Sequence, residues 1–384
     1  MVSSLTMYIE IADDIIADAI RKGGSGVNDS LDLLTLFALN AQKGKHIVHV
    51  PWLHNNPTGK RALEGIMGRQ HVAFLLRAEG IYYQLARLKQ IVSVYAIITY
   101  DQSKGNPQAI LINPLQEKKF EPYNETRVIT ENIIDSTFLK YVIKFFLREC
   151  AIRNCKFCFV PLMGGGDTTA DVVKHEVEER QFFCLAISDS DRKCPYARYG
   201  QTATKIQDVI NSYHPFNCDL YVMDQVMEIE NLIPIEIVKK YASNKGYQKV
   251  FSLDSSFYDM KYGLTLNWLY DDDVCDYWRN MLYGLHVSFT QRDTAKRNST
   301  CRKDYKRYVE MHNYSSQIKE GFGVDLLTRC ACDFDAKGHR LDPRIKERLM
   351  NVKPRDLTTF QYNEWMKIGR ILFSWTCCME NKRV

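Results

Sequence analysis

Apolar runs of strand length alternate with amphipathic stretches through the middle of the chain. The runs KFCFVPLM (156–163), QFFCLAIS (181–188) and DLYVMD (219–224) predict strands, and the stretches at 168–180 and 200–212 predict helices between them. Alternating strands and helices with continuously apolar strands indicate a mostly parallel sheet. Ligands of such sheets bind beyond the carboxyl ends of the strands.

The N-terminal part of the chain also mixes both kinds of pattern. We expect helices at 4–22, 30–43, 61–89 and 131–150, a strand at 46–53, and a strand pair at 91–100 and 108–115 around the turn DQSKGN. These elements predict a second α/β region.

The length of 384 residues favours more than one domain. We predict an α/β fold with a central, mostly parallel sheet flanked by helices at 151–240. An N-terminal α/β region of unknown role would occupy 1–150. A mixed, mainly helical region would occupy 241–384, with helical patterns near 267–285 and 343–351.

The composition is that of an ordinary globular protein, with 45% hydrophobic and 25% charged residues. The net charge of +5 permits a phosphate-rich partner without demonstrating one. The start of the chain carries Glu10, Asp13, Asp14 and Asp18, which makes a secretory signal a poor interpretation. No apolar run approaches the roughly 18 residues of a membrane helix. We therefore expect a cytoplasmic protein with no membrane partner.

The chain has 12 cysteines, two of which have zinc-like spacing at Cys155-x-x-Cys158. They lie in a predicted strand, where positions three apart face opposite sides, so both thiolates could not reach one ion. We expect buried core thiols instead.

Three elements that suit phosphate and metal chemistry follow successive predicted strands. The first is MGGGD (163–167), in which glycines permit close backbone approach at the start of a helix, where an anion is favoured. The second is Asp189-Ser190-Asp191, whose carboxylates would point to one side of an extended chain and suit Mg²⁺. The third is Glu228-Ile229-Glu230-Asn231, which offers a similar pair if extended. We expect all three at one edge of the sheet.

Each element also has a plainer interpretation. A glycine-rich segment before a helix is often only a turn, and Asp-x-Asp after a strand is often a turn or a helix cap. Glu-x-Glu is usually a solvated face. The chemical interpretation depends on the order and position of the three elements together.

This order resembles a Toprim domain, the module of topoisomerases, bacterial primases and overcoming-lysogenization-defect nucleases. The segment Glu228–Ile233 is most similar to the modules of that last group and of related prokaryotic anti-phage effectors. The resemblance covers roughly 155–235, and DMKYGLT (259–265) extends it weakly. It implies that Asp189 and Asp191 hold Mg²⁺ or Mn²⁺.

Other residues follow from the same resemblance. Glu230 would be a further metal ligand, a catalytic residue or an orienting group, and Gly164 and Asp167 match the family's Gly-x-x-Asp. Met163 stands where the family has a catalytic glutamate, and a thioether neither transfers a proton nor suits Mg²⁺. Either Asp167 or Glu228 replaces that glutamate, or the site binds without cutting.

Positions that would contact phosphate or nucleic acid lie beside these acids. They are Gly164, Gly165, Gly166, Arg192 and Lys193, although the last two also fit exposed surface charges. The basic run at 291–308 fits either nucleic-acid binding or a solvated loop. The segment HNNPTGK (54–60) echoes a phosphate loop, but it lacks the first glycine and the Ser or Thr after the lysine, so we favour a turn.

The sequence thus predicts a Toprim-like, Mg²⁺- or Mn²⁺-dependent nuclease-type effector of anti-phage defence, with nucleic acid as its partner. One alternative is a catalytically degraded Toprim fold that acts as a nucleic-acid-binding or assembly module. Another is a nucleotide-binding sensor that uses the glycine loop. A protein partner or a homo-oligomer stays open.

Overall fold

A computed structural model describes most of the chain. It covers residues 7–24, 26–241, 256–265 and 317–379, together with six isolated positions between 268 and 278. The basic run at 291–308 and most of the helix predicted near 267–285 lie outside these residues.

The chain forms two compact units. Unit 1 contains the residues up to Ile187, Ile206–Tyr221 and the residues from Met366, whereas unit 2 contains Ser188–Lys205 and Val222–Trp365. Each unit is described by itself. The boundaries predicted near residues 150 and 240 stay a prediction.

Unit 1 contains a four-stranded parallel sheet, sheet A, in its N-terminal part. Its strands are β1 (Tyr8–Ile11), β2 (Ile47–His49), β3 (Tyr95–Ile98) and β4 (Ala109–Ile112), in the order β2-β1-β3-β4. The predicted helix at 4–22 was therefore wrong in its first part, because a strand precedes the helix. Tyr8, Ile9 and Ile11 are buried in β1, and a strand buried on both faces shows no alternation that would identify it.

The helix predicted at 30–43 is confirmed, whereas the other helices that accompany sheet A are shorter than predicted. The helices are α1 (Asp13–Lys22), α2 (Asp29–Gln42), α3 (Pro51–Asn55), α4 (Pro57–Met67), α5 (Arg69–Leu75), the 3₁₀ segment η1 (Leu76–Ile81) and α6 (Tyr82–Ile91). The single helix expected at 61–89 is broken at Gly68, whose φ of 86° is left-handed. The strand pair expected at 91–100 and 108–115 is confirmed, and it is parallel.

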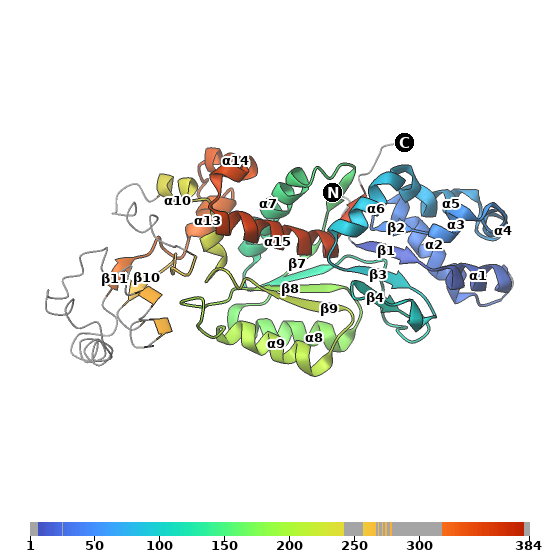
Figure 1. Cartoon of the computed structure of the whole chain (residues 1–384), viewed down its shortest axis with the longest axis horizontal. Helices are drawn as coiled ribbons and strands as arrows, with labels where there is room; N and C mark the ends of the chain where they lie inside the picture. The colour runs from blue at the N-terminus through green and yellow to red at the C-terminus, as the bar shows by residue number, and fades with distance from the viewer. Residues whose placement is uncertain are drawn as a thin grey trace. The chain divides into compact units, whose positions relative to one another are not determined.

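A second four-stranded sheet, sheet B, combines three strands of the predicted central region with one strand at 127–130, which precedes that region and was not predicted. Its strands are β5 (Arg127–Thr130), β7 (Val160–Met163), β8 (Cys184–Ser188) and β9 (Cys218–Val222), in the order β7-β5-β8-β9. The structure confirms the α/β class, with parallel sheets flanked by helices. In Figure 1, α8 (Thr169–Glu179) and α9 (Gln201–Tyr213) lie on one face of this sheet and α7 (Ile133–Glu149) on the other.

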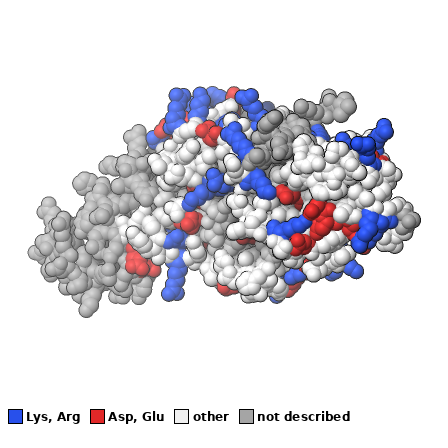
Figure 2. Space-filling view, turned by 45° about the vertical axis from the view of Figure 1, so that its right-hand side comes forward, with Lys and Arg blue, Asp and Glu red and all other residues white. Residues whose placement is uncertain are grey.

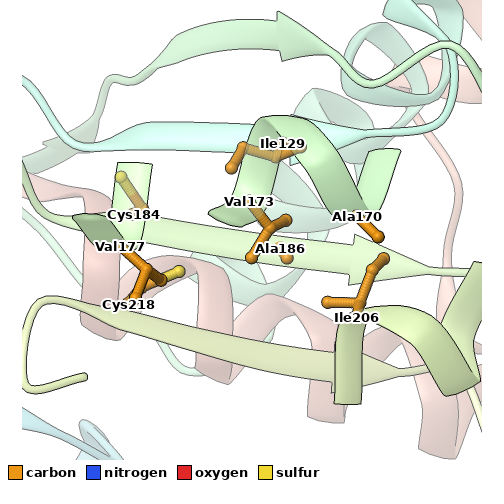
Figure 3. Packing of buried hydrophobic residues seen from close by; sticks show 8 residues of the cluster. All are labelled: Ile129, Ala170, Val173, Val177, Cys184, Ala186, Ile206 and Cys218. Atoms are coloured by element: carbon orange, nitrogen blue, oxygen red, sulfur yellow. The ribbon is translucent and has the colours of Figure 1, made fainter. Parts of the chain in front are cut away.

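The core of sheet B follows the predicted alternation of strands and helices. Figure 3 shows side chains of α8 and α9 packed onto β5, β8 and β9; the eight residues of this cluster are Ile129, Ala170, Val173, Val177, Cys184, Ala186, Ile206 and Cys218. On the other face, α7 packs against the second half of α15 (Thr359–Thr376). A Cβ on Gly369 would lie only 2.4 Å from Cβ of Phe146, so glycine permits this close approach.

The predicted strand KFCFVPLM divides into two strands that belong to different sheets. β6 (Cys155–Phe157) pairs antiparallel with β12 (Cys377–Met379), and β7 pairs with β5. Cys155 is buried, and all ten cysteines within the described ranges are free. The prediction of buried core thiols is confirmed for Cys155 but wrong for Cys158, which is only partly buried.

Unit 2 is mainly helical in its described part. It contains η4 (Ile229–Leu232), α10 (Ile235–Tyr241), β10 (Gly263–Thr265), β11 (Gln317–Glu320), α13 (Leu326–Ala331), α14 (Pro343–Met350), η8 (Pro354–Asp356) and the start of α15. The helix predicted near 343–351 is confirmed by α14. Across the described residues, no helix has the length and apolar character needed to cross a membrane.

Candidate functional site

Hydrogen bonds connect the Asp189-Ser190-Asp191 segment to residues 226–229. The backbone N–H of Asp191 donates to the carbonyl of Met227 at 2.8 Å, and the amide of Ile229 donates to Oδ1 of Asp189 at the same distance. The Ser190 hydroxyl donates to the Val226 carbonyl at 2.5 Å. The structure thereby brings two of the three predicted elements together within unit 2.

The aspartate pair does not lie on an extended chain, which was the condition for its predicted geometry. Asp191 has a left-handed φ of 52°, which aspartate tolerates better than most residues. Its side chain packs close to Gly200, whose amide donates to the Ser190 carbonyl at 2.8 Å. Asp189 is almost fully buried, whereas Asp191 is exposed.

The Glu228–Asn231 segment is also not a plain strand. Glu228 is extended, but the following residues form η4. Asn231 holds this turn, because its Oδ1 accepts from the Glu228 amide at 2.9 Å and its Nδ2 donates to the Tyr258 carbonyl at 2.7 Å. Gln361 donates to the Asn231 carbonyl at 2.9 Å. Both glutamates are buried.

A lysine that the sequence analysis did not select lies between these glutamates. Nζ of Lys261 is 3.0 Å from Oε2 of Glu228 and 3.3 Å from Oε1 of Glu230. The only signal in the sequence was the weak extension of the resemblance to DMKYGLT, which contains this residue. Its thirty-residue separation from the glutamates hides the pairing from any local pattern.

The loop that carries Lys261 is tied to the same carboxylates. Oε1 of Glu228 accepts from the amides of Met260 at 2.9 Å and Lys261 at 3.3 Å. Asp259 accepts from the amides of Lys261 at 3.0 Å and Tyr262 at 2.7 Å. We call Asp189, Asp191, Glu228, Glu230 and Asp259, with Lys261, the acidic cluster.

The electrostatics of the acidic cluster follow from burial and from one central cation. Burial raises the pKa of Glu228 to about 8, with a further contribution from the charge of Glu230. Burial also raises the pKa values of Glu230 and Asp259. Burial alone would lower the pKa of Lys261, but the surrounding carboxylates outweigh it and raise that pKa. Lys261 is thus the cation common to these carboxylates, and the charge of Lys193 also acts on Asp191.

The donor set of the acidic cluster suits a hard cation. Oε2 of Glu230 is buried and accepts no hydrogen bond, which is costly unless a ligand or a proton compensates it. Among the described residues, however, no three His, Cys, Asp or Glu side chains already surround a common point that would hold an ion. Mg²⁺ needs only one or two carboxylates and completes its coordination with water and phosphate, so Oε2 of Glu230 could serve as one such ligand.

Comparisons with known proteins identify no relative. No family model matches this chain. Neither the curated proteins nor the solved structures give a match. The Toprim resemblance thus stays a prediction.

The glycine loop of MGGGD belongs to unit 1, so its position relative to the acidic cluster stays a prediction. The amides of Gly164 and Gly165 donate to the carbonyls of Thr130 and Glu131 at 2.8 and 3.0 Å. These two amides thus already have partners within the unit. Gly165 and Gly166 have left-handed φ values of 81° and 66°, which explains the need for glycine. Asp167 is exposed on the 3₁₀ turn that precedes α8.

Arg192 and Lys193, which follow the aspartate pair in the sequence, both make contacts in unit 2. Nε of Arg192 donates to the Ala197 carbonyl at 2.9 Å, and its guanidinium lies 5.4 Å from the ring centre of Tyr199. Nζ of Lys193 lies 5.2 Å from the ring centre of Trp268. If these two side chains contact phosphate, as predicted, they would do so through N–H groups that are not engaged in the contacts above.

Proposed function

We propose that the acidic cluster of unit 2 is the site of a divalent-metal-dependent, phosphodiester-processing protein of the nuclease type. The observation that carries this proposal is the buried Oε2 of Glu230, which has no hydrogen-bond partner in a cluster where carboxylates outnumber the single ammonium. Mg²⁺ or Mn²⁺ is the ion whose chemistry matches such oxygens.

Some residues of the cluster would have a structural role, and others would bind the cation. Asp189 and Glu228 already hold backbone amides, so they position the segment and the Lys261 loop. Asp191 and Glu230 have the oxygens best suited to a cation and its phosphate. A bound cation would polarise that phosphate and stabilise the charge that develops on its oxygens. The positive charge of Lys261 opposes the rise in the pKa values of Glu228 and Glu230 that burial causes.

The substrate that we propose is nucleic acid, encountered in the cytoplasm. Free cysteines throughout the described residues fit a reducing compartment. Acidic and basic side chains are interspersed on the described part of the face shown in Figure 2, which fits selective contact better than a broad electrostatic surface. A role in anti-phage defence is part of the proposal only through the resemblance to such effectors.

Cleavage by the purified protein tests the proposal. Plasmid and tRNA are incubated with Mg²⁺ or Mn²⁺, and a parallel reaction contains excess chelator. We expect divalent-dependent cleavage that falls by at least about a hundredfold in an Asp189→Asn/Asp191→Asn double variant. The matched control is Asp208→Asn, an exposed aspartate on α9, which should cut as the wild type does. Undiminished cleavage by the double variant would contradict the site.

A binding or assembly module is the second candidate, and one observation favours it. Met163, which stands at the position of the family's glutamate, is 60% exposed at the end of β7 and offers no acid to a reaction. If the protein is such a module, neither the wild type nor the Asp189→Asn/Asp191→Asn double variant should cut, and both should retard DNA equally in a gel. Divalent-dependent cutting by the wild type alone would reject it.

A further inference from the structure

Sheet A has a topological switch point between its two central strands. The chain runs from β1 to β2 on one side and then crosses to β3 on the other side of β1. In parallel sheets of this order, the crossovers leave in opposite directions and open a crevice beyond the carboxyl ends of the two strands. Small ligands bind preferentially in such crevices.

A pocket of about 530 Å³ lies at this point, within unit 1. Its apolar lining comes from Ile11 and Ala12 at the end of β1 and from Ile97 in β3. This volume lies in the range of small-molecule sites, roughly 300–1,000 Å³. The pocket is therefore large enough for a flat heterocycle with an attached sugar.

The charged lining of the pocket is held in ion pairs. Glu10 pairs with Lys89, whose Nζ lies 2.9 Å from its Oε2, and Asp13 pairs with Lys104. Glu10, Asp13 and Lys104 all line the pocket. Because each carboxylate has its own cation, the lining disfavours a strongly charged ligand. Fixed carboxylate oxygens are instead acceptors for hydroxyl groups, as in the recognition of ribose by an acidic side chain.

The aromatic lining of the pocket is Trp52 of α3, which is positioned by a glycine of the HNNPTGK segment. A Cβ on Gly59 would lie 2.2 Å from Cη2 and 2.4 Å from Cζ3 of Trp52, so only glycine lets the indole lie against α4. The amide of Gly59 donates to Oδ1 of Asn56 at 2.8 Å, so Asn56 caps α4, and residues 57–60 begin this helix instead of forming the predicted turn. The glycine of this segment therefore serves to position an aromatic ring.

We propose that this pocket binds a nucleoside, with the base against the ring of Trp52 and the ribose hydroxyls donating to Glu10 and Asp13. An aromatic ring accepts any base through stacking, and apolar side chains cover the remaining surface of the ligand. Asn55 also lines the pocket and supplies an amide for a polar edge of the base.

Calorimetric titration of the full-length protein tests this assignment. The probes are adenosine, guanosine, cytidine and uridine, with 2′-deoxyadenosine and free ribose as partial ligands. We expect at least one ribonucleoside to bind with a Kd below about 1 mM. Removal of the 2′-hydroxyl should weaken binding severalfold, and ribose alone should not bind measurably. Failure of all four ribonucleosides to bind, or equal binding of adenosine and 2′-deoxyadenosine, would overturn the proposal.

Variants locate the binding at this pocket. Trp52→Ala should weaken binding about tenfold or more, because stacking of a base contributes about 1–3 kcal/mol. Trp52→Phe should retain most of the affinity, whereas Trp52→Leu, which keeps apolar volume without an aromatic ring, should weaken binding as the alanine variant does and replaces it if that variant does not fold. Tyr196→Ala removes an exposed aromatic ring of unit 2 and should change nothing. Binding that survives Trp52→Ala unchanged would overturn the assignment.

The outcome is independent of the proposed nuclease site. The Asp189→Asn/Asp191→Asn double variant changes unit 2 alone and should bind the nucleoside as the wild type does. Loss of nucleoside binding in that variant would place the ligand outside the pocket of sheet A and overturn the inference.

Discussion

Nζ of Lys261 lies 3.3 Å from Oε1 of Glu230, the carboxylate whose other oxygen is buried without a hydrogen-bond partner. The lysine thus supplies a positive charge inside a group of buried acids. This charge compensates part of the cost of burying them, which would otherwise favour their protonation. The same ion pair joins the 259–262 loop to η4, so Lys261 has both a structural and an electrostatic role.

Replacement of Lys261 by methionine should destabilise unit 2. The side chains of Glu228 and Glu230 are only 6% and 4% exposed, so they would lose their only cation within hydrogen-bond distance among the described residues. Removal of one partner of a buried pair typically costs about 3–5 kcal/mol. We expect a Tm lower by several degrees, measured by differential scanning calorimetry.

The matched control is Lys239→Met on α10. Lys239 pairs with Glu236 at 2.7 Å, but both side chains are exposed. A pair of this kind contributes roughly 0–1 kcal/mol, so the melting temperature should hardly change. If the two methionine variants melted at the same temperature, the central role of Lys261 would be rejected.

Divalent cations should stabilise the protein through the acidic cluster. A ligand that binds only the folded state raises its stability, by about 2.7 kcal/mol at a hundred times its Kd. Millimolar Mg²⁺ or Mn²⁺ should therefore raise the Tm of the wild type by a few degrees, and chelator should reverse this. An Asp191→Asn/Glu230→Gln variant should show no such shift, whereas Asp208→Asn should respond fully. An equal shift in all three proteins would place the cation elsewhere.

The parts of the fold that sequence patterns predicted well are those with a local signature. The strand β8 is a continuous, fully buried run, and the alternation of β7, β8 and β9 with helices identified the parallel sheet. β1 was hidden, because Met7–Ile11 continues without a turn into the apolar spacing of α1. Only pairing with β2 and β3 makes it a strand.

The candidate site likewise contains some residues that a local sequence pattern identifies and others that only the folded structure reveals. Asp189 and Asp191 were found because two acids after an apolar run stand out in the sequence. Lys261 was missed, since its partners are about thirty residues away and only the turn at η4 brings them together. The role of Gly200 is also tertiary, because it depends on a side chain nine residues earlier in the chain.

The stability of unit 1 should depend on pH through His46. Burial lowers the pKa of His46 to about 3, against a usual value near 6.5. Between these two values the unfolded chain binds a proton that the folded protein excludes, so stability falls as the pH drops through 6.5. The free energy of unfolding should therefore be about 2 kcal/mol lower at about pH 5 than at about pH 7.

Substitution of the buried imidazole should remove this dependence. His46 has a left-handed φ of 56°, which asparagine tolerates, so His46→Asn is the suitable variant. Urea denaturation between about pH 5 and about pH 7 should show a flatter profile for this variant than for the wild type. His175→Asn, on the exposed face of α8, controls for removal of an imidazole. Parallel profiles for the wild type and His46→Asn would contradict the assignment.

Gly200 should be required for the position of Asp191. A Cβ at Gly200 would lie 2.2 Å from Oδ2 and 2.4 Å from Cβ of Asp191, so Gly200→Ala must displace the aspartate without removing a charge. We expect this variant to lose most of the divalent-dependent cleavage and of the thermal shift by Mn²⁺. Gly65→Ala is the matched control, because a Cβ at Gly65 meets nothing within 4 Å inside α4 and alanine favours a helix by roughly 0.5–1 kcal/mol. It should keep full activity and melt slightly higher than the wild type. If Gly200→Ala cut and bound Mn²⁺ normally, Asp191 would not need its observed position, and the metal site would have to be sought among the other carboxylates of the cluster.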